Sequence, residues 1–191
     1  MTNINKVKIM TISALLSALG ILIPMTFPGI RIEPASYTLA SHVPVFIAMF
    51  ISPTVAAFVA AISTFGFFIG GFPIVIVLRA MTHLIFALLG AYILKHNKHV
   101  FSTVKSTALF NLLIALTHGI AEIAVVTYFY QINGIPVEYY EKGYLISVIL
   151  LVGVGTMVHS ILDFSIALFV WKPLQQVMPI PANARIKINR N

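Results

Sequence analysis

The sequence has no cysteine, and it is poor in charged residues. Without cysteine the chain has no disulfide framework, no thiolate metal site and no thiol nucleophile. Charged residues make up 9% of its 191 residues, whereas about a quarter of a typical soluble domain is charged. These shortages exclude an ordinary cytosolic domain, a disordered chain and a nucleic-acid-binding protein.

Apolar residues are abundant instead: they form 59% of the chain, and the mean hydropathy is +0.98. At roughly 20 apolar residues per span, the sequence predicts six helices joined by short loops. The apolar runs are Val7–Ile23, Tyr37–Ile51, Pro53–Ile69, Pro73–Leu94, Thr103–Tyr130 and Tyr144–Trp171. They are continuously apolar rather than alternating, which favours helices over a β-barrel.

The expected fold is therefore an all-α integral membrane protein with six transmembrane helices, in a single domain over residues 1–191. The second and third runs are short and closely joined at Ser52 and Pro53. A broken or re-entrant hairpin is the alternative to two full spans in this part of the chain.

The basic residues are unevenly distributed along the chain. On one side of the predicted spans lie most of the 12 Lys and Arg residues, namely Lys6, Lys8, Lys95, Lys98, Lys105, Lys172, Arg185, Lys187 and Arg190. The other side has Arg31, Lys142, Glu33, Glu138 and Glu141. The positive-inside rule predicts that both termini of this multi-pass plasma-membrane protein are cytoplasmic. The net charge of +7 is then a topology signal and not a nucleic-acid footprint.

Three of the predicted helices carry an ionisable pair at positions i and i+4, and one further histidine precedes them. The set consists of His42, Arg79, His83, His118, Glu122, His159 and Asp163. Positions i and i+4 share a helix face, so each pair forms one polar patch. A charge that faces lipid costs from roughly 2.5 to over 10 kcal/mol, so these groups face each other, a cavity or water. They form either a polar substrate site or a set of interhelical hydrogen bonds.

Arg79 and Glu122 lie in the outer parts of their predicted helices. A guanidinium can bind a carboxylate through two parallel hydrogen bonds, and Glu122 beside His118 can engage a ring nitrogen or an N–H group. The pattern suits a small, planar, anionic heteroaromatic ligand. An internal salt bridge between Arg79 and Glu122 is the alternative. Asp163, in the inner half of its helix, is either part of the site or a fixing partner for His159.

Aromatic residues surround the predicted outer mouth, and most of them are expected to form an interfacial belt. Tyr139, Tyr140 and Tyr144 are the candidates to stack on a ligand ring, because they lie in the loop that leads into the last run. The proline-bearing segment Met25–Ser36 is expected to be either a gate over an outward-facing cavity or a plain extracellular loop.

Small residues are spaced four apart in the first run, where Ala14 and Ala18 stand beside Ser13 and Ser17. This spacing permits close contact between helices in lipid. The contact is either internal to this chain or a docking face for another membrane protein.

These features together resemble the substrate-binding S components of energy-coupling factor (ECF) vitamin transporters. The basic N-terminus, Ala14-xxx-Ala18, the proline-bearing loop and Ser41-His42-Val43-Pro44-Val45-Phe46 carry the resemblance, which covers the whole chain. The stretch Ala40–Gly90, including Pro73 and Arg79, is most similar to the niacin-specific branch.

The resemblance implies that the chain binds niacin near the outer face, between the loop after the first helix and helices four to six. It also implies a transmembrane coupling subunit, contacted through Ala14 and Ala18, and two cytosolic ATPases, with toppling of the S component carrying the ligand inward. Pyridoxine, pantothenate and riboflavin are the alternative ligands. No cofactor is expected in this chain, and it has no GxxxxGK[ST] phosphate loop of its own.

A metal-dependent intramembrane enzyme is the alternative from another class of function. HxxxE at His118 and HxxxD at His159 can place metal ligands on one helix face. No nucleophile or base stands out near all the pairs, so we expect neither an enzyme nor a metal site. A secondary transporter or channel would show internal symmetry, and the sequence shows none. The candidate substrate-binding residues are Arg79, His83, His118, Glu122, His42, Tyr139, Tyr144 and His159.

Overall fold

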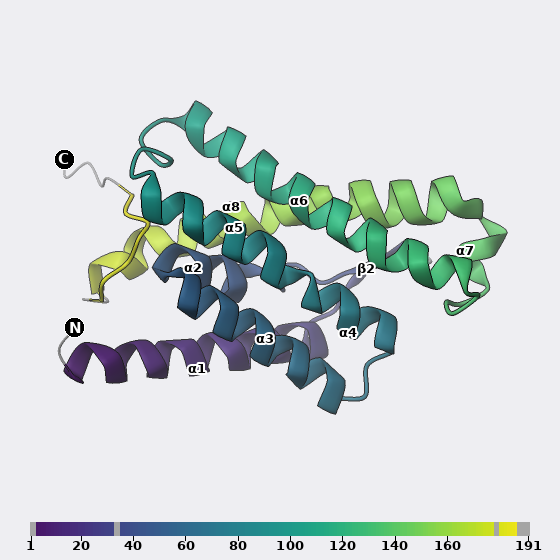
Figure 1. The fold of residues 1–191 in the computed structure, drawn as a ribbon, viewed down its shortest axis with the longest axis horizontal. Helices are drawn as coiled ribbons and strands as arrows, with labels where there is room; N and C mark the ends of the chain where they lie inside the picture. Colours follow the sequence, from purple (N-terminus) through teal and green to yellow (C-terminus); the bar gives the residue numbers. More distant parts are fainter. Residues whose placement is uncertain (1–2, 33–34, 178–179, 187–191) are drawn as a thin grey trace.

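An apolar chain can cross a bilayer only when its backbone N–H and C=O groups are hydrogen-bonded within the protein. The structure is accordingly a bundle of helices (Figure 1). The computed structural model describes residues 3–32, 35–177 and 180–186. Its elements are α1 (Asn3–Thr26), β1 (Ile30–Ile32), β2 (Ala35–Tyr37), α2 (Val43–Ile51), α3 (Pro53–Ile69), α4 (Ile74–Met81), α5 (His83–His96), α6 (Val104–Gln131), α7 (Glu138–Glu141), the π-helix η1 (Leu145–Val154) and α8 (Gly155–Val177).

Four helical segments of the described chain are long and apolar enough to cross a membrane. They are Asn3–Thr26, Ile74–His96, Val104–Gln131 and Leu145–Val177. Helix α3 is apolar but shorter, with 17 residues. The chain is therefore a multi-pass membrane protein, as its composition predicts.

Helix α2 differs from the span predicted for Tyr37–Ile51. It has nine residues, which extend over about 14 Å, less than half of a hydrocarbon core about 30 Å thick. The prediction of a helix from Tyr37 is wrong, because Tyr37 belongs to β2 and the helix begins at Val43. Ser52 alone separates α2 from α3, and its hydroxyl accepts a hydrogen bond from the N–H of Val55, which caps the new helix.

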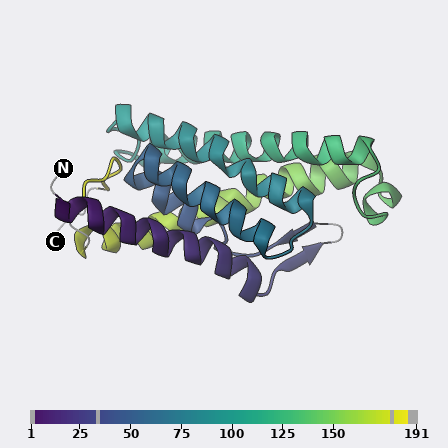
Figure 2. The same ribbon diagram turned by 60° about the horizontal axis from the view of Figure 1, so that its bottom comes forward.

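The segment after α1 folds as a short two-stranded antiparallel hairpin, which the sequence did not predict in this otherwise helical chain. Ile30 pairs with Tyr37 and Ile32 with Ala35. Figure 2 shows the hairpin beyond the end of α1, at the end of the bundle opposite to the chain termini. Glu33 and Pro34, at the turn of the hairpin, lie outside the described residues.

The start of α1, the loop between α5 and α6, and residues 180–186 lie at one end of the bundle (Figures 1 and 2). The hairpin, the turn between α3 and α4, and α7 lie at the other end. Lys187 and Arg190, which contribute to the predicted charge bias, lie outside the described residues. The two termini thus lie at the same end of the bundle, as an even number of membrane crossings requires. Which side of the membrane this end faces remains a prediction.

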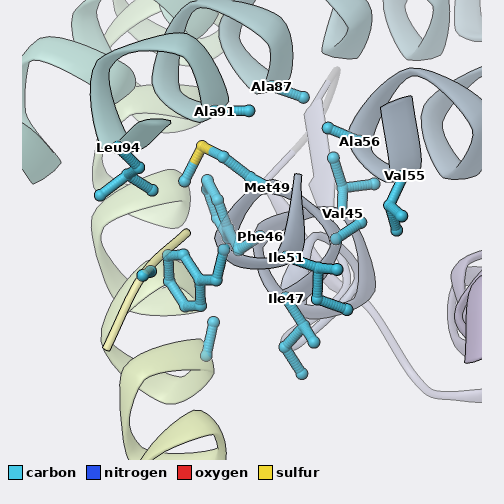
Figure 3. Close-up of a cluster of buried hydrophobic side chains, with 14 of the residues drawn as sticks. Val45, Phe46, Ile47, Met49, Ile51, Val55, Ala56, Ala87, Ala91 and Leu94 are labelled. Atoms are coloured by element: carbon cyan, nitrogen blue, oxygen red, sulfur yellow. The ribbon is translucent and has the colours of Figure 1, made fainter. Parts of the chain in front are cut away.

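The core surrounds α2, all of whose residues are buried. Met49 extends toward Ala87 and Ala91 of α5 (Figure 3), where Gly90 leaves room for its sulfur. Phe46 packs on the other side against Phe164 of α8, with ring centroids 5.3 Å apart. This packing holds α2 inside the bundle and fixes the position of the residues just before it.

Candidate ligand-binding site

A cavity of about 340 Å³ lies between β2 and the helices α1–α8, each of which contributes to its lining. This volume is at the lower end of the range for small-molecule sites. The residues that line it are Gly20, Pro24, Tyr37, Thr38, Ser41, His42, Val45, Ser63, Phe67, Phe72, Pro73, Val75, Ile76, Arg79, Ala80, His83, Glu122, Pro136, Tyr139, Thr156 and His159. An apolar wall with a few convergent polar groups is the usual composition of a ligand pocket.

The structure brings most of the predicted substrate-binding residues to this cavity. His42, Arg79, His83, Glu122, Tyr139 and His159 line it. His118 is fully buried and does not line it, although it adjoins Glu122. Tyr144 lies elsewhere, since its hydroxyl is 2.8 Å from the Thr127 hydroxyl and its ring contacts Tyr130.

Arg79 and Glu122 form the internal ion pair that the sequence left open. Nε and Nη2 of Arg79 donate to Glu122 Oε2 over 3.1 and 2.7 Å. Thr156 Oγ1 donates to the same oxygen over 2.6 Å, and His118 Nε2 lies 3.4 Å from Oε1. The guanidinium keeps further N–H donors for a ligand, because it has five in all.

Asp163 fastens the segment before α2 to α8. Its two carboxylate oxygens accept backbone hydrogen bonds from Ala40 and His42, over 2.7 and 2.9 Å. His42 Nδ1 lies 3.1 Å and His159 Nε2 lies 3.3 Å from Oδ2. The carboxylate is fully buried and does not line the cavity, so its role is to position these two histidines.

Four imidazoles cluster beside the cavity, and three of them, all but that of His118, line it. The ring centroids of His83, His118 and His159 lie 4.7, 4.8 and 4.9 Å from that of His42. Each comes from a different element: His42 caps α2, His83 begins α5, and the others lie in α6 and α8. Two groups place one ligand atom per residue within 4.8 Å of the others: His42, His83 and His118, and His42, His159 and Asp163.

Tyr37 reaches the cavity from the hairpin and was not among the candidate site residues. Its hydroxyl donates to the carbonyl of Leu151 in η1. Gly155 makes this possible, because a Cβ there would overlap the hydroxyl. Burial raises the pKa of Tyr37 to about 12, so the phenol keeps the proton it donates. The hairpin is thereby tied to the π-helical segment beside the site.

Sequence reasoning also missed four Ser and Thr residues that line the cavity, Thr38, Ser41, Ser63 and Thr156. Ser41 Oγ lies 3.1 Å from His159 Nε2, and Ser63 Oγ has no hydrogen-bond partner within the described residues. Thr156 precedes His159 by three residues and so shares its helix face, a signal the sequence does contain. Ser63 lies in an apolar run without such a signal.

The small residues of α1 divide between two faces. Ser13 and Ser17 are buried, whereas Ala14 and Ala18 are exposed. Internal packing therefore uses the serine face, and the alanine face is left open toward the surroundings.

No family model matches the chain, and no solved structure matches it. The niacin transporter NiaX of Lactococcus lactis subsp. cremoris is 42% identical to it over 176 residues. The matched region covers 92% of this chain and 78% of that relative. The relative is a transporter and not an enzyme, so an enzymatic function of the buried histidines is set aside.

Proposed function

Because the chain belongs to the niacin-specific branch of the substrate-binding S components of ECF transporters, we propose that it binds niacin for import across the plasma membrane. The observation that carries this proposal is the small cavity whose wall holds the Arg79–Glu122 pair. A pyridine ring with one carboxyl or amide group suits the cavity better than the much larger riboflavin does.

The polar groups of the cavity wall can bind both ends of such a ligand, its carboxylate or amide group and its ring nitrogen. The N–H donors of Arg79 that Glu122 does not use bind the carboxylate or the amide oxygen. His42, His83 or His159 engages the ring nitrogen, and Tyr139 packs against the ring. Ser63, which has no partner among the described residues, supplies a further hydrogen bond.

The ion pair also bears on which form of niacin is taken. Arg79 already has a carboxylate partner, so the site does not depend on a negative charge from the ligand. We expect the site to accept both nicotinate and nicotinamide.

Six passages through the membrane remain part of this proposal, within one domain over residues 1–191. The segment around α2 makes the second passage, and α3 makes the third. Both termini face the cytoplasm, as the positive-inside rule predicts. Import requires a transmembrane coupling subunit that docks on Ala14 and Ala18 and two cytosolic ATPases.

Calorimetry on the purified chain, without ATP, tests the proposal. Nicotinate and nicotinamide are titrated beside pyridoxine, pantothenate and riboflavin. We expect heat from the two forms of niacin and none from the other vitamins. Binding of another vitamin in place of niacin would change the ligand, and heat from none of them would refute the function.

A further inference from the structure

Hydrogen bonding does not explain the position of one of the four clustered histidines. His118 is fully buried, and neither of its ring nitrogens has a hydrogen-bond partner within the described residues. Its Nε2 is 3.4 Å from Glu122 Oε1 without forming a hydrogen bond. An unpaired polar group in a buried place costs about 1–3 kcal/mol. This cost would be removed if the two nitrogens bound a partner other than a hydrogen-bonding group of the protein.

The His42 ring lies beside that of His118, with centroids 4.8 Å apart, and one of its nitrogens takes part in no hydrogen bond within the described residues. Its Nδ1 is engaged by Asp163 Oδ2 at 3.1 Å, which leaves Nε2 available. An imidazole oriented by a carboxylate on one nitrogen while the other faces a cluster is the arrangement found around bound metal ions. Asp163 is itself fixed by the two backbone N–H groups before α2.

The local charge favours a cation. Glu122 is balanced by Arg79, whereas the partners of Asp163 are imidazoles and backbone N–H groups. With neutral imidazoles, the ionisable groups described around the cluster therefore carry one unbalanced negative charge. A divalent cation would compensate that charge and would also favour an anionic ligand in the cavity.

We propose that His42, His83 and His118 bind one divalent transition metal ion, of the kind that imidazole ligands suit, such as Zn²⁺, Co²⁺ or Ni²⁺. Their ligand atoms lie within 4.8 Å of one another. A tetrahedral site with metal–nitrogen bonds of about 2.1 Å needs them about 3.4 Å apart, so the rings close in by roughly an ångström. This site departs from the metal-free site that the sequence predicts.

The fourth coordination position faces the cavity, because His42 and His83 both line it. A ligand in the cavity then meets the ion through its carboxylate or its ring nitrogen. This last step rests on the proposed function, whereas the metal site itself does not.

Cobalt spectroscopy on the full chain in detergent tests the metal site. The protein is stripped with a chelator and titrated with Co²⁺, whose visible absorption is strong in a tetrahedral site. We expect one Co²⁺ per chain, displaced by Zn²⁺. His83→Ala and His118→Ala should each abolish the signal, and Asp163→Asn should weaken binding by about 10–100-fold. His96→Ala and His99→Ala, at the opposite end of the bundle, are the matched controls and should bind as the wild type does.

A further variant guards against misfolding. His83→Cys keeps a metal ligand, and we expect it to bind Co²⁺ with a new sulfur-to-cobalt band in the near ultraviolet. Absence of Co²⁺ and Zn²⁺ binding by the wild type would overturn the proposal. So would Co²⁺ binding that survives either His83→Ala or His118→Ala.

Titration of nicotinate into stripped and Zn²⁺-loaded protein separates this inference from the proposed function. Tighter binding to the loaded form supports both. Niacin binding by a chain that takes up no metal would overturn the metal site alone. Metal binding without niacin binding in either form would refute the proposed function and leave the metal site standing.

Discussion

Arg79 donates two hydrogen bonds to a single oxygen of Glu122, from α4 to α6 across the wall of the cavity. Thr156 of α8 donates to that same oxygen. Together with Thr156, the pair thus joins three helices. The remaining guanidinium N–H groups are available to a ligand in the cavity. Its two charges can be altered separately, which makes it the most informative place to perturb the site.

Glu122→Gln should shift the preference of the site toward nicotinate. Removal of the carboxylate leaves the Arg79 charge unpaired, and breaking a buried pair costs about 3–5 kcal/mol. An anionic ligand can restore the lost partner and the neutral amide cannot. We expect the ratio of nicotinate to nicotinamide affinity to rise at least about tenfold, measured by calorimetry. Glu138→Gln, at an exposed position of α7, is the control, and equal changes for both ligands would contradict the prediction.

The double variant Arg79→Met, Glu122→Gln should fold but should prefer nicotinamide to nicotinate. Replacing both members of a buried ion pair by neutral groups of similar volume is often tolerated. We expect nicotinate binding to weaken far more than nicotinamide binding, while the melting temperature stays near that of the wild type. Equal losses for the two ligands would make Arg79 a purely structural residue.

Tyr37→Phe should speed release of the ligand. The variant keeps the ring but removes the donor to the Leu151 carbonyl, at a cost of about 1–3 kcal/mol. If the hairpin opens for the ligand to leave, dissociation accelerates at least about fivefold in a chase with unlabelled ligand. Tyr128→Phe, exposed on α6, is the matched control and should not change the rate.

The contribution of the Tyr37 hydroxyl has a defined pH range. The pKa of Tyr37 is raised to about 12 by burial, so the donor is present below that pH and is lost as pH rises through it. The ratio of the Tyr37→Phe rate to the wild-type rate should therefore be flat from pH 6 to pH 9. A ratio that falls within this range would show that the pKa of Tyr37 is not raised.

Asp163→Ala should destabilise the chain more than any change at an exposed polar position of α8. It leaves the N–H groups of Ala40 and His42 without acceptors, at about 1–3 kcal/mol each. We expect a clear drop in the melting temperature in detergent. Ser165→Ala, an exposed serine of the same helix, is the control. Equal melting temperatures for the two variants would contradict the prediction.

Ala14→Leu and Ala18→Leu should block transport and spare binding. Both alanines are exposed on α1, so a larger side chain disturbs a partner and not the packing of this chain. Uptake by vesicles that contain the complete transporter is compared with ligand binding by the isolated chain. Ala61→Leu, at an exposed alanine of α3, is the matched control. Loss of binding in the α1 variants would show that the alanines serve internal packing.

The sequence predicts those parts of the structure that local chemistry determines. Pro53 and Gly70–Gly71 bound α3 as expected, because proline starts a helix readily and glycine ends one. The pairs at i and i+4 bring Arg79, His83, Glu122 and His159 to one cavity, because the helix period places them on inward faces.

Other features depend on contacts between distant segments, which no local pattern reports. The run from Tyr37 is apolar enough for a helix, but strand pairing with Ile30 and the bond to Leu151 hold Tyr37 in the hairpin. Tyr139 and Tyr144 are equivalent by sequence, yet a short helix and a turn send only Tyr139 to the cavity. The sequence likewise could not decide between a free Arg79 and its pairing with Glu122.

The absence of cysteine allows a direct measurement of where niacin binds. Thr38→Cys places a single thiol in the cavity wall, and Gln131→Cys places one at the exposed end of α6. The labelling rate of each thiol with a maleimide is measured with and without nicotinate. We predict that nicotinate slows labelling of the Thr38→Cys variant and leaves the Gln131→Cys variant unchanged. If nicotinate binds to the Thr38→Cys variant and its labelling rate does not change, niacin does not occupy this cavity.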